Sequence, residues 1–229
     1  MVDVPDVLEL SAPQARVLGC LMEKEATTPE VYPLTLKALT TACNQSTNRH
    51  PVVEYDTSLV ENTLHALKGK GLARIVHPGS GERATKYRHV ATEALGLDPA
   101  EAALLCVLLL RGPQTVAELR TRTERIHPFA SAGEVEEALG SLASTDGSPH
   151  HPFAMQVERQ PGQKEARWIQ LLEVDAEGRA AAPASPGAVT ASTRGSSRVE
   201  ELETRVAALE YRLESLVDAL GDLVELPEE

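Results

Sequence analysis

Residues 55–90 constrain the fold most, because they join a predicted helix directly to a pair of predicted strands. Ser58 and Glu61 have the spacing of a capping box, which predicts where the helix begins. Gly69 and Gly71 end it, and two extended runs follow, separated by a turn rich in Pro and Gly. The apolar residues at helical intervals are Leu59, Val60, Leu64 and Leu67. A helix followed by a two-stranded ribbon is the second half of a winged helix.

Two further helices are predicted before this stretch. Ser11 is suited to cap the first, and apolar residues over 34–42 mark the second. The segment between the second and third helices, 44–51, is polar and longer than the tight turn of a minimal helix-turn-helix. Residues 11–92 therefore indicate a first winged-helix domain, preceded by a loose acidic lead-in over residues 1–10.

The same plan repeats over residues 93–172. The predicted helix starts are Asp98, Thr115 and Ser131, and the predicted strands are 153–157 and 166–172. The third of these helices carries Glu134, Glu136 and Glu137, which would face phosphate with like charge. We therefore expect the second winged-helix domain to be a protein-contact or spacing element rather than a second reader of DNA.

Three segments resemble the YceH-like family of bacterial proteins. They are the run LSAPQARVLG at 10–19, the run CNQSTNRHPVV at 43–53, and the glycine-terminated helix after Tyr55. The resemblance extends from residue 10 to about residue 172, and the asparagine-rich run is its most specific part. It implies a pair of tandem winged-helix domains, and it supports the fold more than the function.

The C-terminal quarter has a different composition. Residues 173–197 are rich in Ala, Pro, Gly and Ser, which predicts a flexible linker. Residues 198–226 then predict a coiled-coil helix, because every a and d position of four heptads is Val or Leu. These positions are Val199, Leu202, Val206, Leu209, Leu213, Leu216, Leu220 and Leu223. Charges at the flanking e and g positions favour a parallel homodimer, while apolar e and g positions near the end leave a trimer or another protein surface as alternatives.

Charge is segregated along the chain, whose formal net charge is -12. Residues 11–92 hold 10 Lys+Arg against 7 Asp+Glu, giving +3. Residues 98–172 hold 7 against 10, giving -3, and residues 173–229 hold 5 against 13, giving -8. The acidity is concentrated in the tail, which leaves one mildly basic domain able to meet phosphate.

The candidate nucleic-acid contacts lie mainly in this basic domain. A winged helix sets its third helix near the major groove and its ribbon along the backbone, where Lys and Arg displace counterions. Asn62 is the candidate for a base edge, since an amide can pair bidentately with adenine. The predicted contact residues are Asn48, Arg49, Asn62, His65, Lys68, Lys70, Arg83, Lys86 and Arg88. The alternative is a solvated surface whose charges provide solubility.

The polar segment 44–49 also has two interpretations. It could present amides and a guanidinium to nucleic acid or a partner, or its short polar side chains could bond their own backbone and cap helix ends. The structural interpretation is favoured slightly. Arg49 is the exception, because the only carboxylates near it in the sequence are Glu54 and Asp56.

Several classes of protein are disfavoured. No run of about 18 apolar residues and no N-terminal signal occur, so we expect a soluble cytoplasmic protein with no membrane partner. The spacing of Cys20, Cys43 and Cys106 predicts packed core residues rather than a disulfide or zinc site. His127 and the pair at 150–151 lack partners at ligand spacing, so no metal or other cofactor is expected. No phosphate loop, nucleophile elbow or paired catalytic carboxylates occur, so we expect no catalytic residues and no enzyme.

The predicted fold is therefore α+β, with two tandem winged-helix domains, a flexible linker and a C-terminal coiled-coil helix. The leading hypothesis is a DNA-binding, transcription-regulator-like protein that contacts double-stranded DNA through the first domain and pairs through its C-terminal helix. The alternative is a scaffold or adaptor protein that uses both winged helices for contacts with a protein partner.

Overall fold

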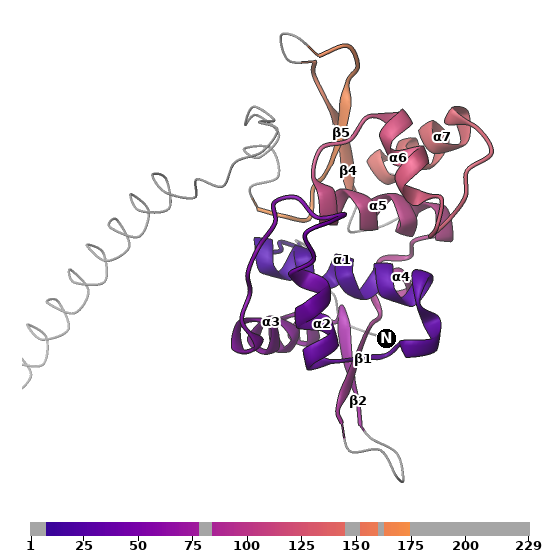
Figure 1. Ribbon diagram of the computed structural model, residues 1–229. Coiled ribbons are helices and arrows are strands. Elements are labelled where there is room, and N and C mark those ends of the chain that lie inside the picture. Colours follow the sequence, from indigo (N-terminus) through magenta and orange to yellow (C-terminus); the bar gives the residue numbers. More distant parts are fainter. Residues whose placement is uncertain (1–7, 78–83, 145–151, 160–162, 175–229) are drawn as a thin grey trace, which may run out of the picture. The chain divides into compact units, whose positions relative to one another are not determined.

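The computed structural model describes residues 8–77, 84–144, 152–159 and 163–174. All of them belong to one unit, Met1–Pro183, and the second unit, Ala184–Glu229, lies outside the described residues. The fold is α+β, with two successive helical modules that each end in an antiparallel ribbon (Figure 1). The predicted coiled coil and all but the first two residues of the predicted linker lie outside the described residues.

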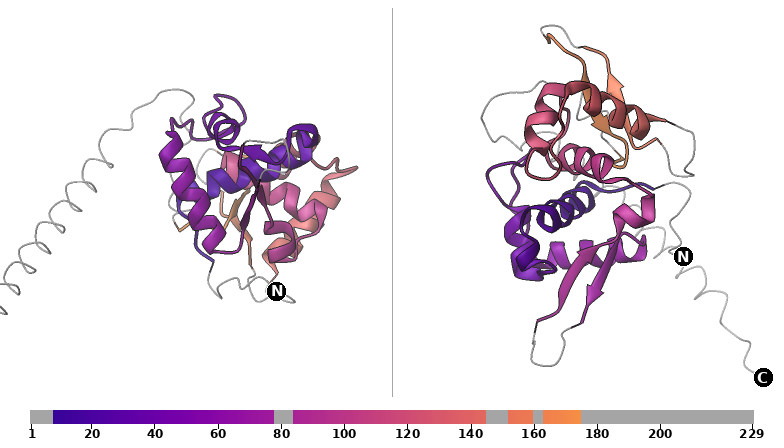
Figure 2. Two further views of the ribbon diagram at one scale, coloured as in Figure 1. Left: turned by 90° about the horizontal axis from the view of Figure 1, so that it is seen from below. Right: turned by 90° about the vertical axis from the view of Figure 1, so that its right-hand side faces the viewer.

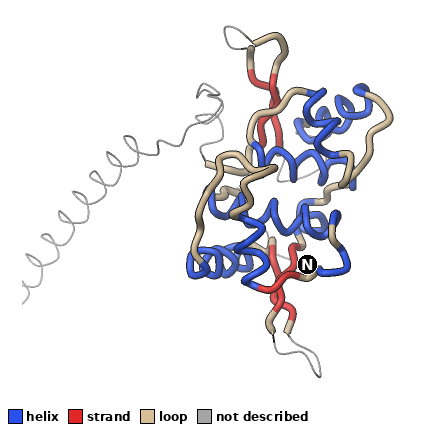
Figure 3. The backbone as a smooth tube through the Cα atoms, in the orientation of Figure 1, coloured by secondary structure: helices blue, strands red, loops and turns tan. Residues whose placement is uncertain are grey.

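The first module has the element order of a winged helix. Its elements are α1 (Ala12–Thr27), the 3-10 turn η1 (Pro29–Val31), β1 (Leu34–Thr35), α2 (Leu36–Cys43), α3 (Thr57–Gly69), β2 (Ala73–Val76) and β3 (Lys86–His89). The three strands form an antiparallel sheet in the order β1-β3-β2, drawn in red in Figure 3. The sequence pattern does not predict strand β1, because it places Leu34 in the second helix. Leu34 instead pairs with Tyr87, and the Thr35 side chain caps α2.

Side-chain caps explain where the helices of this module begin. Ser11 caps α1 as predicted, in a reciprocal capping box with Gln14. The start predicted for α3 is wrong. Asp56 Oδ1 accepts the Leu59 N–H at 2.7 Å, so the helix begins with Asp56 as its cap and Ser58 lies inside it.

The second module repeats this order after a connecting helix, α4 (Ala91–Leu95). Its elements are α5 (Pro99–Arg111), α6 (Val116–Thr123), α7 (Ala132–Ala143), β4 (Ala154–Val157) and β5 (Arg167–Gln170). The predicted starts at Asp98, Thr115 and Ser131 are confirmed, because each is an N-cap whose side chain accepts a backbone N–H. Gln114 bridges Trp168 on β5, in the place that β1 has in the first module. Figure 2 shows the two ribbons from the side.

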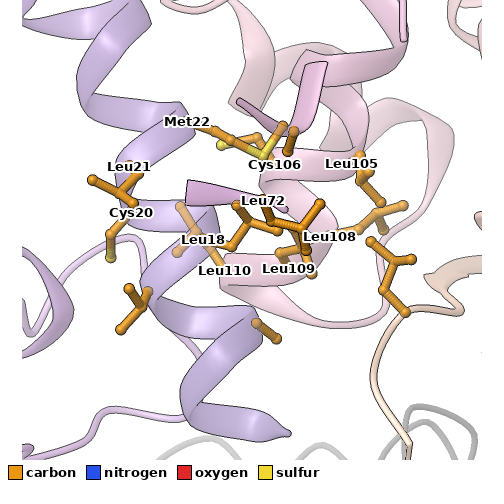
Figure 4. Close-up of a cluster of buried hydrophobic side chains, with 14 of the residues drawn as sticks. Leu18, Cys20, Leu21, Met22, Leu72, Leu105, Cys106, Leu108, Leu109 and Leu110 are labelled. Atoms are coloured by element: carbon orange, nitrogen blue, oxygen red, sulfur yellow. The ribbon is translucent and has the colours of Figure 1, made fainter. Parts of the chain in front are cut away.

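The modules share one hydrophobic core because α1 and α5 pack directly against each other. Figure 4 shows leucine and sulfur-containing side chains of both helices in this interface. A Cβ atom at Gly19 would lie 2.9 Å from Leu110 Cγ, so a side chain at this position would require the Leu109 and Leu110 side chains to move. The Cys106 thiol donates to the Gly19 carbonyl at 3.4 Å, and all three cysteines are buried, as predicted.

Residues near the two ends of the described chain also join the core. Leu8 and Leu10 are buried, so the end of the predicted lead-in is not loose. The Leu10 N–H donates to the Leu172 carbonyl at 2.6 Å, and the Val174 N–H donates to the Leu10 carbonyl at 3.1 Å. Residues 173 and 174, which composition alone places in the linker, therefore belong to the folded unit.

Candidate nucleic-acid interface

Helix α3 has a buried, mainly apolar face and an exposed polar face. Its buried residues are Val60, Thr63, Leu64 and Leu67. Asn62, His65 and Lys68 are exposed on the opposite side, as the helical period requires. In the described part of the chain none of these three side chains has a hydrogen-bond or salt-bridge partner. Glu61 is also exposed on this helix and is the only acid within it. The polar face is therefore available to a ligand.

Basic side chains continue from the end of α3 onto the ribbon. Lys70 follows the helix, and Arg74 and Arg88 stand directly opposite each other on β2 and β3. Like charges at opposite positions of a sheet repel. Neither arginine has a carboxylate within salt-bridge distance among the described residues. Lys86 precedes Arg88 by two residues and so lies on the same face of the sheet.

These residues define the α3–ribbon surface, which comprises Asn62, His65, Lys68, Lys70, Arg74, Lys86 and Arg88. Arg74 was not among the predicted contacts, although its place in β2 opposite Arg88 makes it part of this surface. The predicted contact Arg83 lies outside the described residues. An anion between Arg74 and Arg88 would relieve their mutual repulsion, and a phosphate group has the required charge.

The prediction that Arg49 contacts nucleic acid is wrong. Its side chain is 0% exposed and forms a two-pronged ion pair with Glu23 of α1, with N–O distances of 2.6 and 2.9 Å. The guanidinium also donates to the carbonyls of Ala42 and Asn48 and to the Gln45 side chain. Every part of this side chain is therefore engaged inside the protein. The carboxylate missing from the nearby sequence comes from α1, 26 residues away in the chain.

The rest of the asparagine-rich segment is structural as well. The Asn44 amide accepts the Tyr55 N–H and donates to the Tyr55 carbonyl, both at 2.8 Å, which holds the two ends of the loop together. Asn48 adopts the left-handed conformation, and its side-chain oxygen accepts a hydrogen bond from Arg111 of α5. Its side chain thus links the modules, and its contact with nucleic acid stays a prediction. The His50 N–H donates to the Leu110 carbonyl at 2.8 Å and adds to this link.

His89 connects the ribbon to α1. Its side chain is 4% exposed, its Nε2 lies 2.7 Å from Glu25 Oε2, and its Nδ1 has no hydrogen-bond partner in the described structure. The Tyr32 hydroxyl accepts the His89 backbone N–H at 2.8 Å. Burial lowers the pKa of His89, although the Glu25 carboxylate acts in the opposite direction. The lowered pKa favours the neutral imidazole, whose Nε2–H faces the Glu25 carboxylate.

The second module differs in charge at the corresponding helix. Glu134, Glu136 and Glu137 are all exposed on α7, and Glu134 accepts the Ala130 N–H. A groove of about 880 Å³ lies between α6, the start of α7 and the second ribbon. Its charged lining is mixed, with Arg120, Arg159 and Lys164 beside Glu124, Glu136 and Glu165. No local sequence pattern predicts this groove, because its walls come from segments far apart in the chain.

The described residues contain no cluster of three or more His, Cys, Asp or Glu side chains arranged to hold a metal ion. None of the described helices has both the length and the apolar composition needed to span a membrane.

Comparison with known proteins identifies relatives that match most of the chain. The family model described as "Protein of unknown function, DUF480" matches residues 10–163. A UPF0502 protein of Pelobacter propionicus is 46% identical over 215 residues, covering 93% of this chain and 95% of the relative. A UPF0502 protein of Geobacter sulfurreducens is 48% identical over 200 residues, covering 86% and 88%. The UPF0502 protein YceH of Salmonella paratyphi A is 42% identical over 218 residues, covering 93% and 99%.

Proposed function

The chain belongs to the DUF480 family, as its resemblance to YceH predicted, and from this premise we propose that it binds double-stranded DNA through its first winged-helix module. The observation that carries the proposal is the α3–ribbon surface. Its helix face is exposed, and four of its cations, Lys68, Lys70, Arg74 and Arg88, have no carboxylate partner among the described residues. Unpaired cations beside an exposed helix are suited to phosphate.

In this proposal α3 enters the major groove and the ribbon follows the backbone. Asn62 and His65 lie on the exposed face of α3, where a helix in the groove meets base edges. Asn62 offers both a donor and an acceptor to adenine. Lys68 and Lys70 at the end of the helix and Arg74, Lys86 and Arg88 on the ribbon meet phosphates.

We further propose that two copies act together as a transcription-regulator-like dimer. The heptads over 198–226 supply the pairing, with Val199 and Leu202 as the first a and d positions. Joining two modestly basic modules raises the effective concentration of the second once the first is bound. The dimer would thus offset the weak positive charge of each module.

A titration of mixed genomic DNA fragments with matched variants tests the proposal. Lys68→Gln/Lys70→Gln/Arg74→Gln removes three cations from the α3–ribbon surface. Arg125→Gln/Arg159→Gln/Lys164→Gln removes three exposed cations from the second module and leaves the net charge of the protein the same as in the first variant. We expect the first variant to bind DNA at least about tenfold more weakly than the second at low salt.

Equal weakening of the two variants would indicate attraction by net charge alone and would contradict the assigned surface.

The second candidate function is an adaptor that binds a protein. It is favoured by one observation, the exposed glutamates of α7 in the place of a recognition helix. Failure of the wild-type protein to bind DNA at low salt would select the adaptor.

A further inference from the structure

Arg16 of α1 is a buried cation with no acidic partner. Only 3% of the residue is exposed, and its guanidinium donates to two backbone carbonyls, those of Cys43 at 3.2 Å and Pro51 at 2.5 Å. No carboxylate of the described residues lies within salt-bridge distance of it. A buried charge without an opposite charge is unfavourable, and burial lowers the pKa of Arg16 accordingly. Its neighbour Arg49, by contrast, has Glu23.

A pocket of about 240 Å³ lies beside this side chain. It is formed by both modules and is lined by Ala12, Arg16, Pro51, Val53, Tyr55 and Leu109. All of these except Arg16 present mainly apolar side chains. A cavity of about 150 Å³ with apolar walls is large enough to hold benzene, so this junction pocket has room for a ring with a small substituent.

We propose that the junction pocket binds a small apolar monocarboxylic acid, whose anion neutralises Arg16 and whose apolar body contacts Pro51, Val53 and Leu109. The Arg16 guanidinium has no acidic partner, and a carboxylate would supply one, because a planar guanidinium can donate two parallel hydrogen bonds to a carboxylate. Neutral molecules of the same shape would gain only the apolar contacts. The charge of Arg16 therefore selects the chemical class of the ligand.

The position of the pocket connects it to α3. Tyr55 immediately precedes Asp56, the N-cap of α3, and the Asn44 amide holds the Tyr55 backbone at both its N–H and its carbonyl. A ligand that contacts Tyr55 and Leu109 touches the entry to α3 and the first helix of the second module together. We infer that such a ligand acts as an effector of DNA binding, and this regulatory part rests on the proposed function.

Calorimetric titration of the full chain with sodium benzoate and with benzyl alcohol, a neutral compound of similar shape, tests the site without DNA. Benzoate should bind at least about tenfold more tightly than benzyl alcohol, as a charge-assisted hydrogen bond predicts. Arg16→Gln should remove this preference. Equal affinities of the two compounds for the wild-type protein, or no binding of benzoate, would overturn the proposal.

A second variant keeps the test independent of whether Arg16→Gln folds. Ala12 is the exposed first residue of α1, so Ala12→Phe narrows the pocket without entering the core. Ala132→Phe is the matched control, since Ala132 is the exposed first residue of α7 and lines a different cavity. Ala12→Phe should weaken benzoate at least about tenfold and Ala132→Phe should not. Benzoate binding unaffected by Ala12→Phe would place the ligand elsewhere.

The regulatory part has its own readout. Saturating benzoate should change the dissociation constant for DNA by at least about threefold in the wild-type protein and not in Ala12→Phe. An unchanged dissociation constant, with DNA and benzoate both bound, would overturn the effector role and leave the site. A wild-type protein that binds benzoate but binds no DNA, with or without benzoate, would refute the proposed function and leave the ligand site.

Discussion

Replacement of Arg49 by methionine separates a structural role for this residue from a role in binding. Met approximates the length of the arginine stem and removes the guanidinium, which leaves the Glu23 carboxylate with Lys24 at 3.6 Å as its remaining salt-bridge partner. It also leaves the Ala42 carbonyl without its donor from Arg49. Removing one member of a buried pair strands the other charge, so the expected loss is large.

The structure sets the size of this loss. The Glu23 side chain is 14% exposed and Arg49 is fully buried, so solvent screens the pair little. Breaking a buried ion pair costs about 3–5 kcal/mol. For a folded unit of this length each kcal/mol lowers the melting temperature by about 2–4 °C, so Arg49→Met should melt about 6–20 °C below the wild type.

The pH dependence gives an independent check. Burial acts to raise the pKa of Glu23, but the hydrogen bonds and charge of Arg49 lower it below its ordinary value of 4.5. The folded protein therefore binds this proton more weakly than the unfolded chain does. The stabilisation is present above about pH 4.5 and is lost as the pH falls through the folded pKa. Arg49→Met should remove this part of the acid dependence.

Urea unfolding of Arg49→Met beside Lys68→Met provides the assay. Lys68 is exposed on α3 and has no partner among the described residues, so the same replacement there should change the unfolding free energy by less than about 0.5 kcal/mol. The double variant Arg49→Met/Glu23→Gln should be more stable than the sum of its single changes predicts. An Arg49→Met protein as stable as the wild type would contradict the buried ion pair, and Arg49 would again be a candidate for contact with nucleic acid.

Three further predictions address the junction, the ribbon and the C-terminal helix. Gly19→Ala should lower the unfolding free energy in urea by about 1–3 kcal/mol, because its Cβ would lie 2.9 Å from Leu110. Gly140 has open space around it, so Gly140→Ala should raise the unfolding free energy by about 0.5–1 kcal/mol. Equal effects of the two changes would contradict the close packing of α1 and α5. The lowered pKa of His89 means that the folded state binds this proton more weakly than the unfolded chain does. The wild type should therefore lose stability as the pH falls below about 6.5, and His89→Gln should lose less. Wild-type stability that rises on acidification would contradict a lowered pKa for His89. Removal of residues 198–229 should convert a dimer to a monomer in light scattering, and an unchanged mass would locate the interface elsewhere.

Local signals in the sequence were sufficient for the order of the helices apart from α4, whose N-cap Val90 forms no side-chain cap. Ser11, Asp98, Thr115 and Ser131 each stand at a helix start with an acceptor side chain, so they could be recognised without tertiary information. The prediction of where α3 begins was wrong because two residues with acceptor side chains, Asp56 and Ser58, lie within three positions and either could cap the helix. Strand β1 has only two residues and carries no periodic pattern, so nothing in the sequence distinguished it from the start of α2.

The candidate site was predictable only in part, for a related reason. The exposed face of α3 follows from helical periodicity, which placed Asn62, His65 and Lys68 opposite the apolar stripe. The partner of Arg49 lies 26 residues away on another helix, beyond the reach of any local pattern. One overlooked signal was available: the uninterrupted apolar run of α5 indicates a helix buried on all sides, as its junction with α1 requires.

The salt dependence of DNA affinity tests the central claim most directly. Each phosphate contact contributes about 0.9 to the slope of log K against log salt. Lys68→Gln/Lys70→Gln/Arg74→Gln should therefore flatten the slope by about 2.7, so that the wild type loses about 40-fold more affinity than this variant between about 50 and 200 mM salt. Identical slopes for the two proteins, or no binding by the wild type at low salt, would contradict the claim that the α3–ribbon surface meets the DNA backbone.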